Sequence, residues 1–189
     1  MTRGFTLIEL IIVIGIIAVL GTVSVLSLNP AQLFAQARDT TRMSDLATLQ
    51  TALNLYMADV MPADLDGAGG AFICGTNFGS SVVGAAEQFA GTPVIAQAGV
   101  RTTGGLGWVP VNFGSMTGIS SPIATLPIDP TNTSANNLNY QYSCDNTAKT
   151  FELDAVLEST KYAPKMVNTA DGGDAAGAYE IGSDPGLNL

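Results

Sequence analysis

The sequence predicts an α+β fold, in which a long N-terminal helix packs against a C-terminal antiparallel β-sheet head. Three observations support this prediction: an uncharged apolar run over residues 10–28, a helical apolar stripe that continues from it, and alternating strand-like runs near the C-terminus. The chain has 189 residues, which is enough for one domain and an appendage.

The uncharged run over residues 10–28 is long enough to cross a membrane. Its nineteen residues form a helix of about 28 Å, close to the thickness of the bilayer hydrocarbon. A secretory signal peptide is disfavoured, because the run is too long and no A-x-A cleavage site follows it. The basic residues on its two sides, Arg3 before it and Arg38 and Arg42 after it, do not decide its orientation.

Helix-forming residues continue beyond the apolar run. Pro30 removes one backbone hydrogen bond and is expected to kink the helix. Downstream, apolar residues recur at helical spacing and predict an amphipathic helix that packs on the head: Leu46, Leu49, Leu53 and Tyr56. We therefore expect a kinked helix of about 80 Å over residues 5–58. Residues 5–28 would lie in a membrane or a filament core, and residues 29–60 would be their amphipathic continuation.

Residues 61–124 are rich in Gly, Ser and Thr and predict a long loop region. Within it, residues 81–90 favour one short helix. Residues 107–113, GWVPVNF, favour one short strand that Pro110 confines to an edge or a bulge. We expect Trp108 to lie in the core.

Residues 125–189 predict the sheet and a turn-rich tail. Two alternating runs, residues 138–144 and 150–159, flank the turn DNTAK and predict a β-hairpin. The second run has a mostly polar face and an apolar face, the latter made of Phe151, Leu153, Ala155 and Leu157. Residues 178–182, AYEIG, favour a last edge strand.

The composition excludes several function classes. The chain has no histidine, which removes Ser–His–Asp and Cys–His catalysis and most zinc sites. Its net charge is −9 and its basic residues are sparse, so we expect no nucleic-acid partner. Residues 103–107 come nearest to a phosphate-binding loop, but they do not connect a strand to a helix as such a loop must. We expect no enzymatic activity.

Cys74 and Cys144 are the two cysteines of the chain. In a membrane-tethered protein, two cysteines indicate one disulfide formed in an oxidising compartment. A bridge that closes about 70 residues would stabilise the fold by roughly 4 kcal/mol in the chain-entropy model. The alternative is a pair of unrelated buried thiols.

The stretch RGFTLIEL, residues 3–10, resembles the class III signal of type IV pilins and type II secretion pseudopilins. The resemblance implies that prepilin peptidase removes residues 1–4 as a leader peptide by cutting the Gly4–Phe5 bond, and that the new N-terminal Phe5 is N-methylated. It also implies a pilin-like fold. In that family a proline-rich turn leads into a paired-tyrosine strand, which Tyr140 and Tyr142 match.

Glu9 is a carboxylate at the edge of the apolar run, where an unpaired charge would cost several kcal/mol in hydrocarbon. Cleavage would place the amine of Phe5 one helical turn away. When helices stack with an axial offset, Glu9 of one subunit can meet the Phe5 amine of its neighbour, and a register error leaves both charges unpaired. We expect Glu9 to act in assembly. The alternative is a headgroup-level residue whose side chain reaches water.

Calcium is the small ligand for which the sequence offers candidate binding residues. Asp64 and Asp66 in DLDG, and Asp171 and Asp174 in DGGD, form loose carboxylate clusters in turns. Some type II pseudopilins, which the signal resembles, hold calcium in a loop of the head. The alternative is that these carboxylates are simply solvated, and we expect no other cofactor.

These observations predict a structural subunit of a type IV pilus-type filament. The resemblance implies a single span in the cytoplasmic membrane, with the head outside the cytoplasm. It also implies three kinds of partner: further copies in a helical homopolymer, prepilin peptidase and methylase, and an inner-membrane assembly platform. Two alternatives stay open. One is a type II secretion pseudopilin, in a periplasmic pseudopilus rather than an extracellular pilus. The other is a single-pass membrane protein whose acidic head binds a ligand or an ion.

Overall fold

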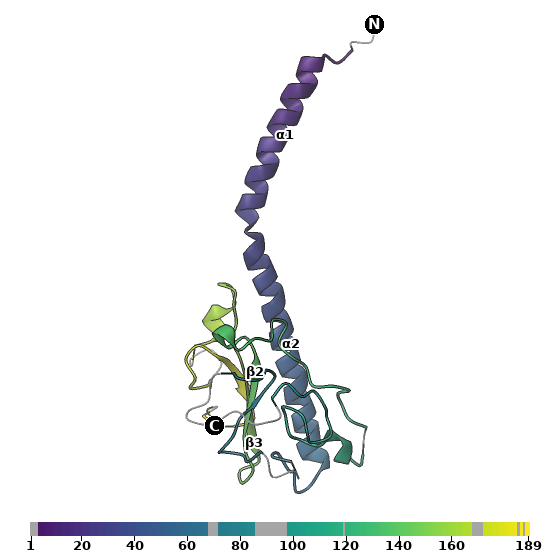
Figure 1. Ribbon diagram of the computed structural model, residues 1–189, viewed down its shortest axis with the longest axis vertical. Helices are drawn as coiled ribbons and strands as arrows, with labels where there is room; N and C mark the ends of the chain where they lie inside the picture. The colour runs from purple at the N-terminus through teal and green to yellow at the C-terminus, as the bar shows by residue number, and fades with distance from the viewer. Residues whose placement is uncertain are drawn as a thin grey trace.

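The computed structural model of the chain describes residues 4–67, 72–85, 98–118, 120–167, 172–184, 186 and 188–189. Two helices, α1 (Leu7–Leu28) and α2 (Pro30–Asp59), form a long rod. α1 extends away from the rest of the molecule, whereas α2 lies along a small sheet (Figure 1). The structure confirms the predicted α+β fold, with a helical N-terminal part and an antiparallel sheet.

The rod is broken between α1 and α2 at Asn29. This residue has left-handed backbone angles, φ 43° and ψ 74°, and it ends α1 and begins α2. Asparagine tolerates this conformation better than most residues, and Pro30 follows at the start of α2, where its missing N–H costs nothing. The expected single helix with a kink at Pro30 is therefore two helices, and the break lies one residue earlier.

The sheet has four antiparallel strands in the order β1-β2-β3-β4. β2 (Tyr140–Asp145) and β3 (Thr150–Ala155) form the predicted hairpin, and β4 (Tyr179–Gly182) is the predicted last strand. β1 (Gly79–Ser80) completes the other edge. The sequence does not predict β1, because two residues are too few to show an alternating pattern.

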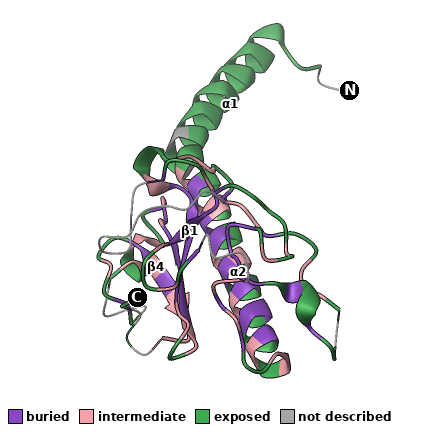
Figure 2. Cartoon of the chain, turned by 60° about the horizontal axis from the view of Figure 1, so that its bottom comes forward, coloured by how far each residue is buried: buried purple, intermediate pink, exposed green. Residues whose placement is uncertain are grey.

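The core lies between α2 and the sheet. The predicted apolar stripe of α2 is buried there, as the purple face of the helix shows (Figure 2). Tyr140 and Tyr142 bring two buried rings from β2. Trp108 comes from the loop region and is fully buried, and its Nε1 donates a hydrogen bond to the carbonyl of Pro127 at 3.0 Å. The loops therefore supply core residues as well as connections.

Residues 107–113 do not form the predicted edge strand. Apart from an isolated bridge between Gly104 and Asn112, the segment has no strand pairing. Its apolar side chains are buried, so it is inserted into the core rather than paired along a sheet edge: Val109, Val111 and Phe113. Of the expected helix at residues 81–90, residues 81–85 form bends and turns, and the rest lies outside the described residues.

A disulfide joins Cys74 to Cys144 across 70 residues of sequence. Cys74 belongs to the loop region after α2, and Cys144, near the end of β2, is fully buried. The bridge attaches a segment with little regular structure to an inner strand of the sheet. Such a cross-link reduces the conformational freedom of the unfolded chain.

Arg42 lies on α2 at the centre of a buried ion-pair network. Its side chain is fully buried and contacts three carboxylates: Asp39 at 2.8 Å, Asp129 at 2.5 Å and Glu158 at 2.7 Å. These carboxylates come from α2, from the turn before β2 and from the segment after β3. Asp39 also accepts the backbone N–H groups of Glu158 and Ser159 at 2.9 and 2.8 Å. The network thus fixes α2 to the chain segments that enter and leave the hairpin.

Arg38 adds a second cation at the edge of this network. Its Nε and Nη2 donate to the two carboxylate oxygens of Glu158 at 2.7 and 3.1 Å, and its side chain is 37% exposed. The hydrogen bond from Arg38, joined by one from Arg42, lowers the pKa of Glu158 below its ordinary value. Glu158 is therefore held as a carboxylate by one buried cation and one half-exposed cation.

We predict that Arg42→Gln lowers the free energy of unfolding by about 3–5 kcal/mol, because buried carboxylates then lose their cation. Arg38→Gln is the matched control. It removes a half-exposed partner and should cost about 1 kcal/mol or less. Urea unfolding of the detergent-solubilised chain, followed by the fluorescence of buried Trp108, measures both. Equal costs for the two variants would contradict the central role given to Arg42.

Candidate processing and assembly segment

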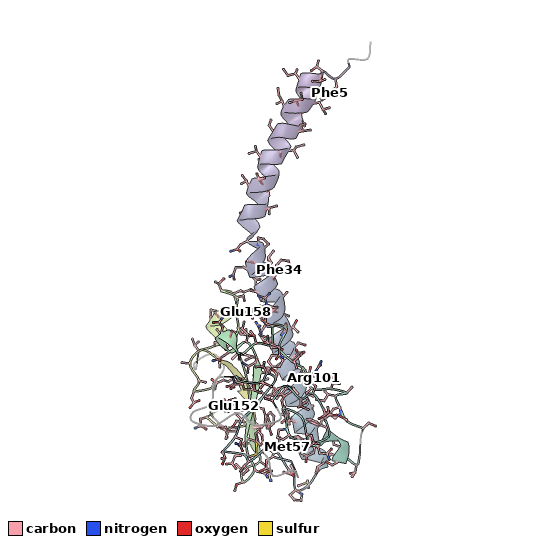
Figure 3. The ribbon with its side chains drawn as sticks, in the orientation of Figure 1. Phe5, Phe34, Met57, Arg101, Glu152 and Glu158 are labelled. Carbon is pink, nitrogen blue, oxygen red and sulfur yellow. A yellow bond between two sulfur atoms is a disulfide. The ribbon has the colours of Figure 1, made fainter. Side chains whose placement is uncertain are left out.

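Residues 4–6 precede α1 and are not helical. Phe5 is 78% exposed and lies at the end of the rod farthest from the sheet (Figure 3). A Cβ added at Gly4 would meet no other atom within 4 Å, so packing within the chain does not require glycine there. The Gly4–Phe5 bond is accessible to another protein, and it lies outside the helical hydrogen bonds of α1.

Thr6 and Glu9 begin α1 with reciprocal hydrogen bonds. The Thr6 hydroxyl accepts the backbone N–H of Glu9 at 3.3 Å, and the Glu9 carboxylate accepts the backbone N–H of Thr6 at 2.9 Å. The Thr6 hydroxyl also donates to the Glu9 carboxylate at 2.6 Å. This capping box satisfies two N–H groups that the first helical turn would otherwise leave unpaired. Glu9 therefore has polar partners within its own helix while Gly4 is still attached.

α1 exposes apolar side chains along its length, and its Leu7–Val25 segment of 19 residues is long and apolar enough to cross a membrane. None of this segment is buried within the chain, as the green of α1 shows in Figure 2. Two hydroxyls in it are satisfied within the helix: Thr22 donates to the carbonyl of Val19 and Ser24 to that of Leu20, both at 2.8 Å. Such a helix suits hydrocarbon or a bundle of helices.

Gly15 and Gly21 interrupt the apolar surface of α1 without a reason in the chain's own packing. A Cβ at either position would meet no atom within 4 Å. Small residues in apolar helices allow the backbones of neighbouring helices to approach closely. Among the described residues, no other part of the chain covers these two positions, so they are suited to contact with a helix of another molecule.

The residues predicted for calcium do not form one site in the described part of the chain. Asp66, in the loop after α2, accepts an N–H of Asn146 at 2.8 Å. Burial, followed by a hydrogen bond with Asp64, raises the pKa of Asp66. Asp174 is exposed, and Asp171 lies outside the described residues. Among the described residues, neither Asp64 nor Asp66 belongs to a group of three carboxylates close enough to share an ion.

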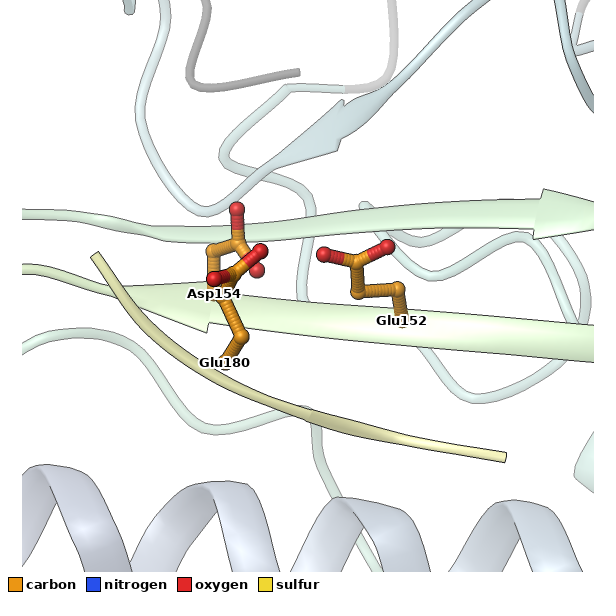
Figure 4. A group of neighbouring side chains, drawn as sticks. All are labelled: Glu152, Asp154 and Glu180. Carbon is orange, nitrogen blue, oxygen red and sulfur yellow. The ribbon is translucent and has the colours of Figure 1, made fainter. Parts of the chain in front are cut away.

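Three other carboxylates do come together on the sheet. Glu152 and Asp154 on β3 and Glu180 on β4 place carboxylate oxygens within 4.8 Å of one another (Figure 4). All three are buried, on the sheet face that points away from α2. Glu152 accepts the N–H of Leu189 at 3.0 Å, and Glu180 accepts that of Ala175 at 3.1 Å. Burial, and next a hydrogen bond with Glu180, raise the pKa of Glu152 to about 8. Glu152 therefore keeps its proton to a higher pH than an ordinary glutamate, and it can share that proton with Glu180.

The sequence analysis identified the second hairpin run's polar face but not this group, because the pattern of one strand does not show which other segments cover that face. The signal that could have revealed it is the repetition of acids at alternate positions of one strand, Glu152 and Asp154, beside another acid in AYEIG. Three carboxylates are fewer than the six to eight oxygens that calcium takes. The shared proton is sufficient to explain why Glu152 and Glu180 lie so close, and we assign no ion to them.

Residues 1–25 match the family model described as the prokaryotic N-terminal methylation motif. This motif is the signal of type IV pilins and pseudopilins, so the resemblance carried by RGFTLIEL is confirmed. The comparisons with curated proteins and with solved structures give no match. The matched residues include the Gly4–Phe5 bond, Glu9 and most of α1.

We predict that the chain loses thermal stability as the pH rises from about 5 to about 8. The folded-state pKa of Glu152 lies above its ordinary value, so the folded chain keeps a proton that the unfolded chain releases. This contribution is complete below the unfolded pKa and is lost as the pH rises through the folded one. Glu152→Gln, which cannot ionise, should flatten the dependence of the melting temperature on pH.

Glu158→Gln is the control for this prediction, since Glu158 has a lowered pKa and titrates below this range. It should keep the downward slope of the melting temperature while lowering its overall level. An unchanged slope in Glu152→Gln would contradict the shared proton.

Proposed function

We propose that this chain is a structural subunit of a type IV pilus-type filament. It is made as a membrane-inserted precursor, cut between Gly4 and Phe5, N-methylated at Phe5, and assembled through α1 into a helical polymer. The observation that carries this proposal is the methylation motif over residues 1–25, because it begins a helix whose apolar surface the chain itself leaves uncovered.

Processing changes the surroundings of Glu9. In the uncut chain, Glu9 caps its own helix through Thr6. Cleavage creates a positively charged amine at Phe5, which is a stronger partner for a carboxylate than neutral donors are. When subunits stack with an axial offset, the Phe5 amine of one copy meets Glu9 of the next. Misregistered helices would leave both charges in an apolar core, so the pair selects the register.

Assembly then covers α1 with other copies of α1. The exposed apolar span supports this step, and Gly15 and Gly21 allow close approach between helices. Before assembly the same surface lies in the cytoplasmic membrane, with the head outside the cytoplasm. The partners implied are the prepilin peptidase and methylase, an inner-membrane assembly platform, and other copies of the subunit.

A pseudopilin of type II secretion carries the same signal, and the steps proposed above apply equally to a periplasmic pseudopilus. A single-pass membrane protein with an acidic, ligand-binding head is the alternative of another class. That protein would need neither cleavage nor methylation, so processing separates it from both filament subunits.

We predict that the mature protein begins with N-methylated Phe5. Intact-mass analysis of the chain from its native envelope should give the mass of residues 5–189 plus one methyl group. A Gly4→Leu variant should keep the mass of the uncut precursor, because Gly4 precedes the proposed scissile bond and a large side chain there would block the peptidase. The chain itself tolerates the change, since a Cβ at Gly4 meets no atom within 4 Å. A wild-type chain that still begins at Met1 would overturn the proposal.

We predict that the charge of Glu9, and not its capping role, is needed for assembly. Glu9→Gln keeps an oxygen that can accept the Thr6 N–H but has no charge, and it should reduce filament yield about tenfold or more. Thr6→Val removes the hydroxyl that caps the helix while keeping Glu9, and it should assemble nearly as well as wild type. Electron microscopy and sheared-filament yield measure both variants. Normal yield from Glu9→Gln would refute the charge-pair mechanism.

A further inference from the structure

The loop of residues 159–167 lies beside the first turns of α2. The Thr160 N–H and hydroxyl both donate to Oε1 of Gln32, at 3.0 and 3.1 Å. Just before the loop, Glu158 pairs with Arg38 and Arg42. In Figure 3, Glu158 and Phe34 are labelled at the end of the head that faces α1. We call residues 159–167 the proximal loop.

The proximal loop is level with the lipid headgroups when α1 crosses a bilayer. The apolar helix α1 ends at Leu28, and Gln32 follows four residues later, which is about 6 Å further along the rod. The headgroup layer on each side of the hydrocarbon is about 5–8 Å thick. The hydrogen bonds from Thr160 to Gln32 therefore hold the loop within or against this layer. This step rests on one part of the proposed function, namely that α1 spans the membrane.

The proximal loop carries unusual charge for this protein. The chain has seven basic residues and a net charge of −9, yet Lys161 and Lys165 lie close together in the loop, and both are exposed. In the described part of the chain, neither lysine forms an ion pair with a carboxylate, whereas Arg38 and Arg42 do. Lys161 lies 4.9 Å from the centre of the Tyr162 ring.

The two described carboxylates that pack between α2 and the start of the proximal loop, Asp39 and Glu158, already have partners. Asp39 is buried and accepts N–H bonds from Glu158, Ser159 and Arg42. Glu158 is paired with two arginines. The exposed charge that the loop presents is therefore positive, on a molecule that is strongly negative overall.

Exposed apolar side chains lie on the first turns of α2 and at the end of the proximal loop. Leu33 and Phe34 on the first turns of α2 are exposed, Phe34 at 67%, and Val167 at the end of the loop is exposed as well. Lysines with long apolar stems, beside aromatic and aliphatic groups, are typical of the membrane–water interface. These side chains do not belong to the core of the head, and Leu33 and Phe34 follow the membrane span just after the break at Asn29.

We propose that the proximal loop and the first turns of α2 form a docking surface for anionic phospholipid headgroups. Lys161 and Lys165 contact the lipid phosphates, while Leu33, Phe34 and Val167 reach toward the acyl boundary. The contact holds the head of the unassembled subunit against the outer face of the membrane. It is released when the subunit leaves the bilayer.

The test uses the full chain reconstituted in nanodiscs of phosphatidylglycerol or of phosphatidylcholine, with hydrogen exchange of residues 159–167 as the readout. Two lysines at an anionic surface should slow exchange of the loop about tenfold or more relative to the zwitterionic discs. About 1 M salt should remove the difference, because it screens exposed charges. Equal exchange in the two lipids would overturn the proposal.

Lys165→Glu and Lys149→Glu form a matched pair of variants. Both change the net charge equally, but Lys149 lies in the turn between β2 and β3. Lys165→Glu should lose most of the slowing in phosphatidylglycerol and exchange like wild type in phosphatidylcholine, which shows that the loop remains folded. Lys149→Glu should behave as wild type in both. If the two variants had equal effects, the slowing would come from the overall charge of the protein, and the proposal of a specific docking surface would be refuted. Cleavage and filament formation play no part in this measurement, so its failure leaves the proposed function untouched.

Discussion

The buried guanidinium of Arg42 is the contact on which the arrangement of this molecule depends. It lies where the fully exposed part of the rod gives way to the part that the head covers, since Ala35, Asp39 and Arg42 are the first buried positions of α2. The cost of removing charges from water offsets much of the attraction in a buried ion network. The network still selects one arrangement of the chain, because few geometries pair every charge. Arg42 therefore determines where along α2 the head sits, and hence how far it stands from the apolar span.

α1 is built for two environments that are alike in polarity. Lipid tails and the side chains of neighbouring helices are similarly apolar, so moving the helix from one to the other changes its solvation little. The groups that distinguish the two states are polar and lie at the ends of the span. In the proposed assembly, Glu9 would exchange its partner Thr6 within the same helix for the amine of another copy. The proximal loop would exchange the proposed lipid phosphates for water. On this proposal, a few charges rather than the large apolar surface would give assembly its direction.

Much of the fold was predictable because its signals are local. The apolar run, the stripe on α2 and the hairpin all show their period within about ten residues. The network around Arg42 was not, because Asp129 and Glu158 lie 87 and 116 residues away from it in sequence. In isolation, Asp39 and Arg42 resemble an ordinary solvated helix pair. The burial of Glu152 was not predicted for a related reason. Alternation identifies the polar face of a strand, but it does not show whether another segment covers that face.

The break at Asn29 gives the rod a place to bend under load. In a continuous helix, a sharp bend requires some of the ladder of backbone hydrogen bonds to break. At Asn29 the ladder is already interrupted, so rotation about the bonds of one residue changes the angle between α1 and α2. A fibre made of such subunits would be compliant where its heads meet its core. When such a fibre is pulled or curved, the junction between its heads and its core would deform first. The packed helices inside would keep their register.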